Sequence, residues 1–223
     1  EDECREISTN INVSDNFQQI KKSAFNDWSL MPNSLSKACL FFNSGNFLNF
    51  LESVTNIKGL ISDPFLEGGG MHQTKHGGLL KMHTDFNWHK KMHLHRRLNV
   101  LFYLNYNYEK NWDGKLLLSN DPTKESTENM ASIEPIFNRL VIFNTNDKTF
   151  HGHPDPLNFP KTYPRTSLAF YYYTSSKRPK NEQKRFNATS TRYIFSINEK
   201  FSGNNSKLKS KIGYFLRRWF PFF

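Results

Sequence analysis

Two histidines and an aspartate have the types and spacing that could hold a metal ion. His83 and Asp85 lie two positions apart in 79–85, a segment that predicts a strand. Side chains at positions i and i+2 of a strand point to the same face, so both could reach one ion. His151 follows another predicted strand, 139–144, and could supply a third ligand. Two imidazoles and one carboxylate on one face leave coordination positions open, which suits non-haem iron(II).

A second histidine competes for the third ligand position. His153 lies two positions after His151, with Gly152 between them, so spacing alone leaves both open. We favour His151 because it directly follows the aromatic end of the segment KTF. The other five of the 8 histidines are interpreted as solvated loop residues: His72, His76, His89, His93 and His95.

The elements that must position these residues are predicted as helices followed by short strands. Helical spacing of apolar residues predicts a helix over 14–28 and a second helical stretch over 34–54, which the sequence Asn-Ser-Gly breaks in two. Leu40, Phe41, Phe47, Phe50, Leu51 and Val54 are expected to form the apolar face of the second stretch. After Gly59, apolar segments separated by turn residues predict strands at 79–85, 97–105, 114–118, 139–144 and 166–174. This order predicts a mainly β barrel or sandwich with the N-terminal helices packed on one side.

The chain is expected to have three regions, and the last one carries the charge. They are an N-terminal helical support region over 1–58, the β core over 59–174, and a basic, aromatic C-terminal tail over 175–223. Of 30 Lys and Arg, 12 lie in 174–223 together with only 2 of the 20 Asp and Glu, so this stretch accounts for the whole net charge of +10. Its end, 206–223, is amphipathic, typical either of a segment that binds an anionic membrane or nucleic acid or of a helix that packs on the barrel.

Other features of the composition bear on location. Cys4 and Cys39 form no recognisable framework and are interpreted as free thiols in a reducing compartment. No apolar run reaches the length that spans a membrane, and the acidic start EDECREISTN does not resemble a signal peptide. We therefore expect a cytoplasmic protein, with a removed leader left open because the sequence does not begin with Met. The oligomeric state is not predicted.

Six motifs between 77 and 174 follow one another at suitable gaps: GGLLKMHTD, RRLNVLFYLN, WDGKLLL, IEPIFNRLVIF, TFHGHP and RTSLAFYYYT. On these motifs, just under half of the chain resembles the iron(II)- and 2-oxoglutarate-dependent dioxygenases of the prolyl 4-hydroxylase type, including the prolyl hydroxylases of the hypoxia-inducible factor. The resemblance implies a double-stranded β-helix (jelly-roll) core, Fe(II) held by His83, Asp85 and His151, and 2-oxoglutarate as cosubstrate. It also makes ascorbate a candidate cofactor.

The resemblance also assigns residues to 2-oxoglutarate. Arg165 opens the last predicted strand, where the family has a basic residue that binds the distal carboxylate, and an arginine can donate two parallel hydrogen bonds to it. Tyr103 matches a family tyrosine that binds the same carboxylate, and Ser167 shares the strand face of Arg165. Asn99, Leu101 and Leu116 are expected to line the pocket, although ordinary barrel packing explains these three equally well.

Substrate contacts are less well defined by the resemblance. Arg96 falls where the factor hydroxylases have a substrate-contacting arginine, but the adjacent Arg97 could take the role in a shifted register. Trp88 lies in the polar segment 86–95, which we interpret as a substrate lid. One departure is clear: Gln73 occupies the position, ten residues before the first ligand, where those enzymes have a tyrosine near the metal.

The reaction implied is oxygen-dependent hydroxylation of a C–H bond, with 2-oxoglutarate converted to succinate and CO2. The leading substrate is a prolyl residue in a peptide or a free proline-like amino acid. One alternative is a hydroxylase of a small metabolite or sugar-linked intermediate. Another is a binding module whose basic tail grips nucleic acid or an anionic membrane.

Overall fold

The computed structural model describes residues 14–16, 19–121, 130–178 and 187–194. The chain separates into two compact units, Glu1–Tyr193 and Ile194–Phe223. Only Ile194 of the second unit is described, so the fold and the site below belong to the first. The amphipathic segment predicted over 206–223, and most of the tail that contains it, lie outside the described residues.

The described residues form a 12-stranded sheet in which neighbouring strands are antiparallel. Its main path runs β5-β6-β11-β4-β10-β7-β8. The strands of this path are β4 (Gly70–Thr84), β5 (Trp88–His89), β6 (Leu94–Tyr103), β7 (Leu116–Ser119), β8 (Met130–Ile133), β10 (Phe150–His153) and β11 (Arg165–Thr174). The strands beside this path are β1 (Ser14–Asn16), β2 (Gln19–Phe25), β3 (Ile61–Ser62), β9 (Leu140–Asn144) and β12 (Arg192–Tyr193).

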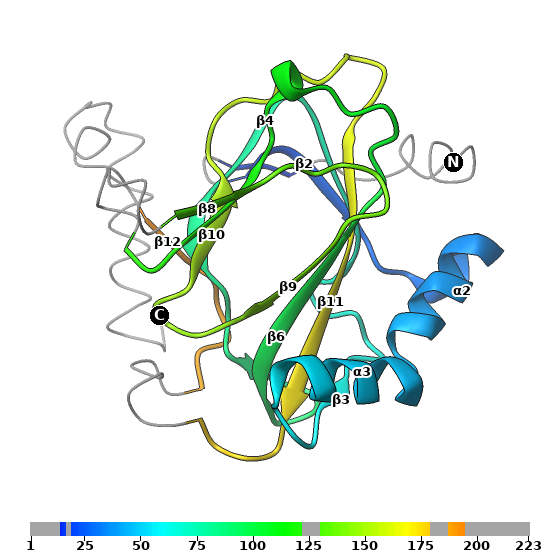
Figure 1. Ribbon diagram of the computed structural model, residues 1–223, viewed down its shortest axis with the longest axis vertical. Helices are drawn as coiled ribbons and strands as arrows, with labels where there is room; N and C mark the ends of the chain where they lie inside the picture. Colours follow the sequence, from blue (N-terminus) through cyan, green and yellow to red (C-terminus); the bar gives the residue numbers. More distant parts are fainter. Residues whose placement is uncertain (1–13, 17–18, 122–129, 179–186, 195–223) are drawn as a thin grey trace. The chain divides into compact units, whose positions relative to one another are not determined.

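Strand β4 joins the two halves of the sheet. Its first residues, Gly70 to Thr74, pair with β11, whereas Leu80 and His83 pair with β10. Figure 1 shows β6, β9 and β11 on one side and β8, β10 and β12 on the other, with β4 passing between them. Gly77 lies at the change of partner with a φ of 71°, which a glycine adopts without strain. The sheet therefore curls on itself, as the jelly-roll prediction requires.

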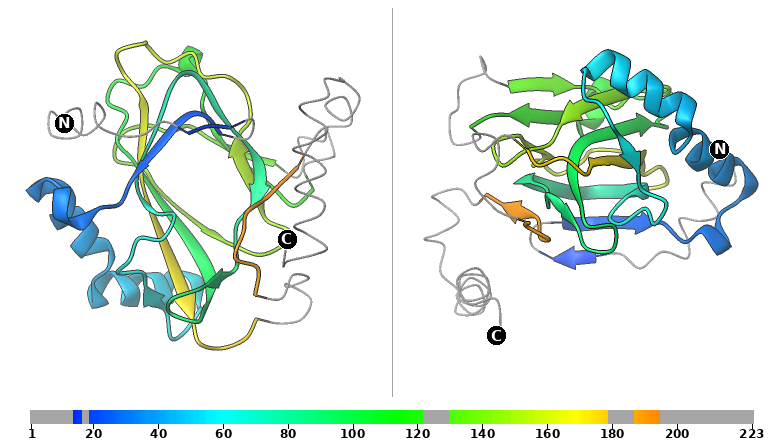
Figure 2. Two further views of the ribbon diagram at one scale, coloured as in Figure 1. Left: turned by 180° about the vertical axis from the view of Figure 1, so that it is seen from behind. Right: turned by 90° about the horizontal axis from the view of Figure 1, so that it is seen from below.

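Two helices cover the outer face of one half of the sheet (Figure 2). They are α2 (Asn33–Phe42) and α3 (Gly45–Thr55), preceded by a short 3-10 turn, η1 (Trp28–Leu30); a second one, η2 (Lys110–Trp112), precedes β7. Ser44 caps α3 by accepting a hydrogen bond from the backbone N–H of Phe47. The predicted break of the helical stretch at Asn43-Ser44-Gly45 is thus confirmed.

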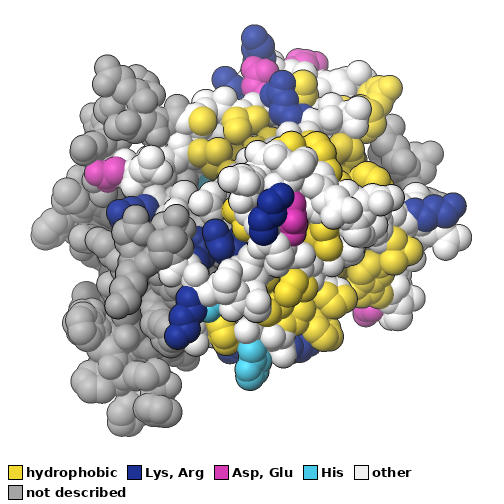
Figure 3. Space-filling model, turned by 60° about the horizontal axis from the view of Figure 1, so that its bottom comes forward, with side chains coloured by type: hydrophobic (Ala, Val, Ile, Leu, Met, Phe, Trp, Pro, Cys, Tyr) yellow, Lys and Arg dark blue, Asp and Glu magenta, His cyan; other side chains and the backbone are white. Residues whose placement is uncertain are grey.

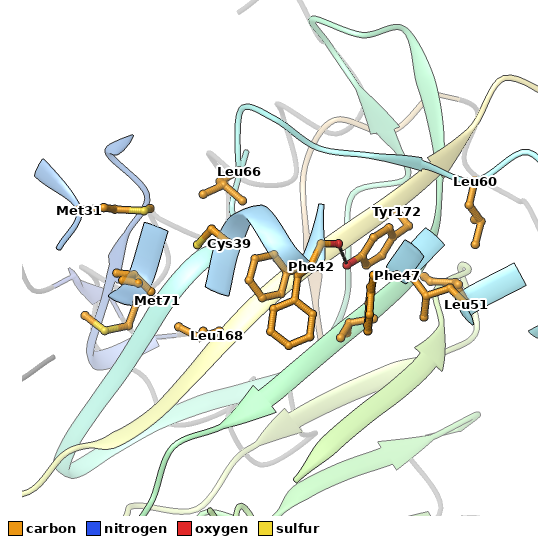
Figure 4. Packing of buried hydrophobic residues seen from close by; sticks show 14 residues of the cluster. Met31, Cys39, Phe42, Phe47, Leu51, Leu60, Leu66, Met71, Leu168 and Tyr172 are labelled. Atoms are coloured by element: carbon orange, nitrogen blue, oxygen red, sulfur yellow. Dashed lines mark hydrogen bonds between the residues drawn. The ribbon is translucent and has the colours of Figure 1, made fainter. Parts of the chain in front are cut away.

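The helices bury an aromatic core against β11 and β6 (Figure 4). Phe42 stacks on Phe170 with ring centroids 4.5 Å apart, and the Tyr172 hydroxyl donates to the Phe42 carbonyl oxygen at 2.7 Å. Leu168, Phe170 and Tyr172 alternate along β11 with residues that face the other way, among them Arg165, Ser167 and Tyr171. One face of β11 therefore anchors the helices while the other is free to line a site.

Two predictions about the N-terminal region were wrong. Residues 19–25 form strand β2, which pairs with β4, whereas a helix was predicted over 14–28. Pairing with a long neighbouring strand overrides the helical spacing of the apolar residues. In α2 and α3, the predicted apolar face is only partly buried: Phe47 and Leu51 are in the core, but four of the six residues are exposed, namely Leu40, Phe41, Phe50 and Val54. Hydrophobic side chains indeed gather on the surface seen in Figure 3.

The helices of the described residues are too short and too polar to cross a lipid bilayer.

Candidate active site

Three side chains converge where β4 and β10 meet. His83 is near the end of β4, Asp85 follows directly after that strand, and His151 lies on β10 opposite His83. The Asp85 carboxylate lies 3.6 Å from His83 Nε2 through Oδ1 and 3.3 Å from His151 Nε2 through Oδ2. One ligand atom from each residue lies within 4.8 Å of the other two. Atoms about 2.1 Å from one ion and at right angles to each other lie roughly 3 Å apart, so this spacing fits a common metal ion.

A backbone contact orients the first histidine. His83 Nδ1 donates to the Lys81 carbonyl oxygen at 2.7 Å, which leaves the lone pair of Nε2 directed toward Asp85 and His151. This pattern, in which one ring nitrogen is held so that the other can bind a metal, is usual in metal sites. The imidazole rings of His83 and His151 have centroids 4.2 Å apart.

Gly152 lets β10 approach β4 closely enough for this arrangement. A Cβ atom at Gly152 would lie 2.7 Å from the Leu80 carbonyl oxygen and 2.9 Å from that of Lys81. Both distances are shorter than side chains tolerate against backbone. His153, on the far side of Gly152, pairs with Leu80 instead of His83. His153 is buried and lines the same cavity, but it is not among the three residues that converge.

The protonation states favour metal binding. Burial acts to raise the pKa of Asp85, but the positive charge of Arg96 outweighs it and holds the pKa well below its usual range. Burial lowers the pKa of His151 to about 3. At neutral pH the site thus offers a carboxylate and a neutral imidazole, the forms that bind cations.

Two polar side chains of β6 hold the carboxylate in place. Arg96 Nη2 donates to Asp85 Oδ2 at 2.9 Å, and Asn99 Nδ2 donates to the same oxygen at 2.7 Å. Arg96 also donates to Asn99 Oδ1, through Nε at 3.0 Å and Nη2 at 2.6 Å. Its guanidinium carbon lies 3.4 Å from the centroid of the Tyr171 ring. Asp85 Oδ1 is the oxygen that remains nearest to His83.

A bulge explains why Arg96, not Arg97, reaches the site. The register of β6 with β11 shifts between Tyr172, which faces Leu98, and Tyr173, which faces Arg96. The shift leaves out Arg97, so that Arg96 and Asn99 both line the cavity. Arg96 is almost fully buried beside Asp85. Contact between Arg96 and a substrate stays a prediction.

Arg165 stands in the same cavity beside Tyr103. Its Nε donates to the Gly114 carbonyl oxygen at 2.7 Å, and its Nη2 donates to the Tyr103 hydroxyl at 3.2 Å. These contacts engage only part of the five N–H donors of a guanidinium. Burial raises the pKa of Tyr103, so its hydroxyl stays protonated and can donate. Ser167, Leu101 and Leu116 line the cavity nearby.

The metal triad and the side chains of Arg96, Asn99 and Arg165 line a cavity of about 250 Å³. Trp88, expected to contact the substrate, is not among the residues that line it. It belongs to β5 and packs on His95, with ring centroids 4.8 Å apart. Residues 86–95, predicted as a loop-like lid, instead contain β5 and the start of β6. Of this segment, Phe86 lines the cavity.

Several cavity residues escaped the sequence analysis. Lys22 and Ala24 come from β2, and Thr191 and Tyr193 come from β12 and the residue before it. Tyr193 pairs with His83, and their rings have centroids 5.2 Å apart. Thr191 and Tyr193 thus line the cavity, although they were predicted to belong to the tail. Neither β2, whose apolar residues have helical spacing, nor the two-residue strand β12 carries a local sequence signal that could have placed these residues.

The fold and the convergent triad define a class, the double-stranded β-helix proteins with a His-Asp-His metal site. Residues 69–173 match the family model of the 2OG-Fe(II) oxygenase superfamily. On this match, the fold and the triad, the matched residues form a core of the 2OG-Fe(II) oxygenase type. This supports a 2-oxoglutarate-dependent dioxygenase whose cofactor is Fe(II), as the motif resemblance implied.

Solved structures share this fold at low sequence identity. A prolyl-4-hydroxylase from Pseudomonas putida is 14% identical with a TM-score of 0.51, over 77% of this chain and 81% of that one. A structure from prolyl 4-hydroxylases of Phytophthora capsici is 19% identical with a TM-score of 0.53, over 97% of this chain but only 62% of that one. A search of curated proteins gave no significant match.

Proposed function

We propose that this dioxygenase hydroxylates a C–H bond of a prolyl residue in a peptide, or of a free proline-like amino acid, with release of succinate and CO2. The observation that carries the proposal is the convergence of His83, Asp85 and His151 in one cavity with Arg165. The fold shared with prolyl 4-hydroxylases and the motif resemblance support the choice of substrate.

In this proposal His83, Asp85 and His151 hold Fe(II) on one face. When bound, Fe(II) and 2-oxoglutarate supply the oxidising chemistry, in which O2 is the second cosubstrate. The hydrogen bonds from Arg96 and Asn99 keep the Asp85 carboxylate ionised and fixed in orientation. Such contacts to a metal ligand typically change metal affinity by about 10- to 100-fold.

Arg165 binds the distal carboxylate of 2-oxoglutarate in this proposal. Arg165 lines the cavity, and its Nη2 donates to the hydroxyl of Tyr103, which lies beside it. Arg165 and the triad both line the cavity, so one small molecule could span from the metal to the arginine. Tyr171, Phe86 and Leu116 supply apolar walls that limit the access of water.

Iron and cosubstrate binding can be tested without knowing the substrate. Protein loaded with Fe(II) and 2-oxoglutarate without oxygen should develop the visible charge-transfer absorption of a chelated keto acid. Proline, prolyl peptides and a set of other amino acids should then be incubated with O2, and products examined by mass spectrometry for the gain of one oxygen atom. Gain of oxygen on proline-containing compounds alone supports the proposal, and gain only on unrelated metabolites contradicts it.

Three further predictions concern the cofactor ascorbate, the location of the protein and the partners of the tail. Ascorbate as a cofactor, a cytoplasmic location, and binding of nucleic acid or anionic membrane by the tail remain predictions from the sequence.

A further inference from the structure

Strand β2 brings a lysine into the wall of the cavity. Lys21 adopts a φ of 51°, and the register of β2 with β4 shifts between Ile20 and Lys22. Lys22 then pairs with Thr74, which pairs in turn with Arg165 of β11. Residues directly opposite each other in a sheet point to the same face, so these three side chains form one row across three strands, and all three line the cavity.

The next row of the same face also lines the cavity. Ala24 pairs with His72, and His72 with Ser167. All three line the cavity, and Ala24 is exposed. The cavity therefore reaches an exposed residue of β2, two positions along the strand from Lys22. Strand spacing of about 5 Å puts the backbones of Lys22 and Arg165 roughly 10 Å apart.

The ammonium group of Lys22 has no hydrogen-bond or ion-pair partner among the described residues. The side chain is half-buried, and burial lowers its pKa to about 8, although the charge of Asp85 acts in the opposite direction. Asp85 itself is engaged by Arg96 and Asn99. A cation held in a partly desolvated position without a partner is unfavourable, and an anion bound beside it would relieve the cost.

The net charge of the cavity also favours the binding of an anion. Four of its side chains carry a formal charge, namely Lys22, Asp85, Arg96 and Arg165. Arg96 and Asp85 compensate each other. The charge of Fe(II) and that of the 2-oxoglutarate dianion are equal and opposite, so Lys22 and Arg165 leave the loaded cavity with an excess of positive charge. Such a cavity favours an anionic molecule as its next ligand.

We propose that Lys22, flanked by Thr74 and His72, forms a substrate subsite for a carboxylate group, distinct from the position where Arg165 binds 2-oxoglutarate. The inference rests on the proposed function, because it assumes that substrate enters the cavity after 2-oxoglutarate. The carboxylate has two sources in a proline-type substrate. It is the α-carboxylate of a free amino acid or the side chain of an acidic residue next to the proline in a peptide.

Two pairs of probes distinguish these sources. L-Proline and L-prolinamide differ in the α-carboxylate, and the doubly capped peptides Ala-Pro-Glu and Ala-Pro-Gln differ in the side-chain carboxylate. Binding is measured calorimetrically to protein loaded with Fe(II) and 2-oxoglutarate without oxygen. We expect the wild type to bind the carboxylate member of one pair about tenfold or more tightly than its amide, as befits a charge-assisted contact.

Lys22→Met should abolish this preference, and Lys22→Arg should retain most of it. Lys21→Met is the matched control: Lys21 is the neighbouring lysine, it is exposed, and its Nζ donates to the His76 carbonyl oxygen at 3.1 Å outside the cavity lining. The control should keep the full preference. Affinity for 2-oxoglutarate and the melting temperature should be the same in all four proteins.

Three results would overturn the subsite. They are equal binding of acid and amide by the wild type in both pairs, a preference that survives Lys22→Met, and a loss of 2-oxoglutarate affinity in Lys22→Met as large as the loss of probe affinity. The last would make Lys22 a cosubstrate ligand. Failure of the proposed function looks different: the acid preference is present and depends on Lys22, but no probe gains oxygen when O2 is admitted.

Discussion

His151 lies directly opposite His83 in the pairing of β10 with β4, whereas His153 lies opposite Leu80. This relationship separates two histidines that spacing along the chain cannot distinguish, because both are buried and both line the cavity. A ligand role for His151 therefore predicts a clear difference between two otherwise similar substitutions.

His151→Ala should abolish the charge-transfer absorption of the protein loaded with Fe(II) and 2-oxoglutarate without oxygen, and so should Asp85→Ala. His153→Ala should keep most of it, because it removes no member of the triad. The measurement is a titration with Fe(II) followed by visible absorption. Loss of the band in His153→Ala but not in His151→Ala would reverse the assignment.

The glycine between these histidines should be intolerant of substitution. Gly152→Ala places a methyl group against two backbone carbonyl oxygens of β4, so β10 must move away and carry His151 with it. We expect Fe(II) affinity to fall at least about tenfold, by analogy with the loss of contacts that orient a ligand. Gly45→Ala is a suitable control, since nothing lies within 4 Å of a Cβ there. Equal iron affinity in Gly152→Ala and wild type would show that the close approach is unimportant.

Arg165 should act on 2-oxoglutarate and not on iron. Arg165→Ala removes a charge-assisted contact worth about 1.5–3 kcal/mol, so affinity for 2-oxoglutarate should fall about 10- to 100-fold. Arg165→Lys keeps the charge but loses the forked geometry, and should lie between. Tyr103→Phe removes one hydroxyl and should cost less. Unchanged affinity for 2-oxoglutarate in Arg165→Ala would disprove the role.

Most of the site could be predicted because its residues lie in strands that are apolar and close to turn signals. Positions i and i+2 of one strand share a face whatever the strand pairs with, which places His83 with Asp85 and Arg165 with Ser167. What the sequence left open depended on partners distant in the chain. The bulge that selects Arg96 over Arg97 and the cross-strand neighbour of His151 are properties of pairs of strands.

Strand β2 also depends on a partner distant in the chain, and here even the type of secondary structure was predicted wrongly. Within 14–28, Phe17, Ile20, Ala24 and Trp28 recur at helical spacing, and no local signal opposes a helix. Hydrogen bonding to β4 decides the outcome. Because β2 was predicted as a helix, Lys22 could not be placed near the metal triad, and the cation argued above to bind substrate was missed.

Arg96 should stabilise the metal site by holding the carboxylate of Asp85 in place. Arg96→Met keeps much of the side-chain volume but removes the ion pair with Asp85 Oδ2 and both contacts to Asn99. We expect Fe(II) affinity to fall about 10- to 100-fold, as for other contacts that hold a metal ligand. Arg97→Met, one position along, is the control, because Arg97 does not line the cavity. A loss of substrate binding with normal iron affinity would instead identify Arg96 as a substrate contact.

Residues 187–194 should be needed for the site although they follow the last long strand. Asn87 and Ala188 exchange two hydrogen bonds of 2.8 Å, and Arg192 Nη2 donates to the Asp147 carbonyl oxygen at 2.9 Å. These contacts hold Tyr193 beside His83. A chain that ends at residue 194 should therefore keep the charge-transfer absorption, whereas one that ends at residue 178 should bind Fe(II) more weakly and melt at a lower temperature. Tyr193→Ala in the full chain distinguishes the loss of the tyrosine ring from the loss of strand β12. It removes the ring from the cavity wall but leaves the backbone pairing of β12 in place. Equal iron affinity in both truncated chains and in Tyr193→Ala would show that β12 covers the site without contributing to it.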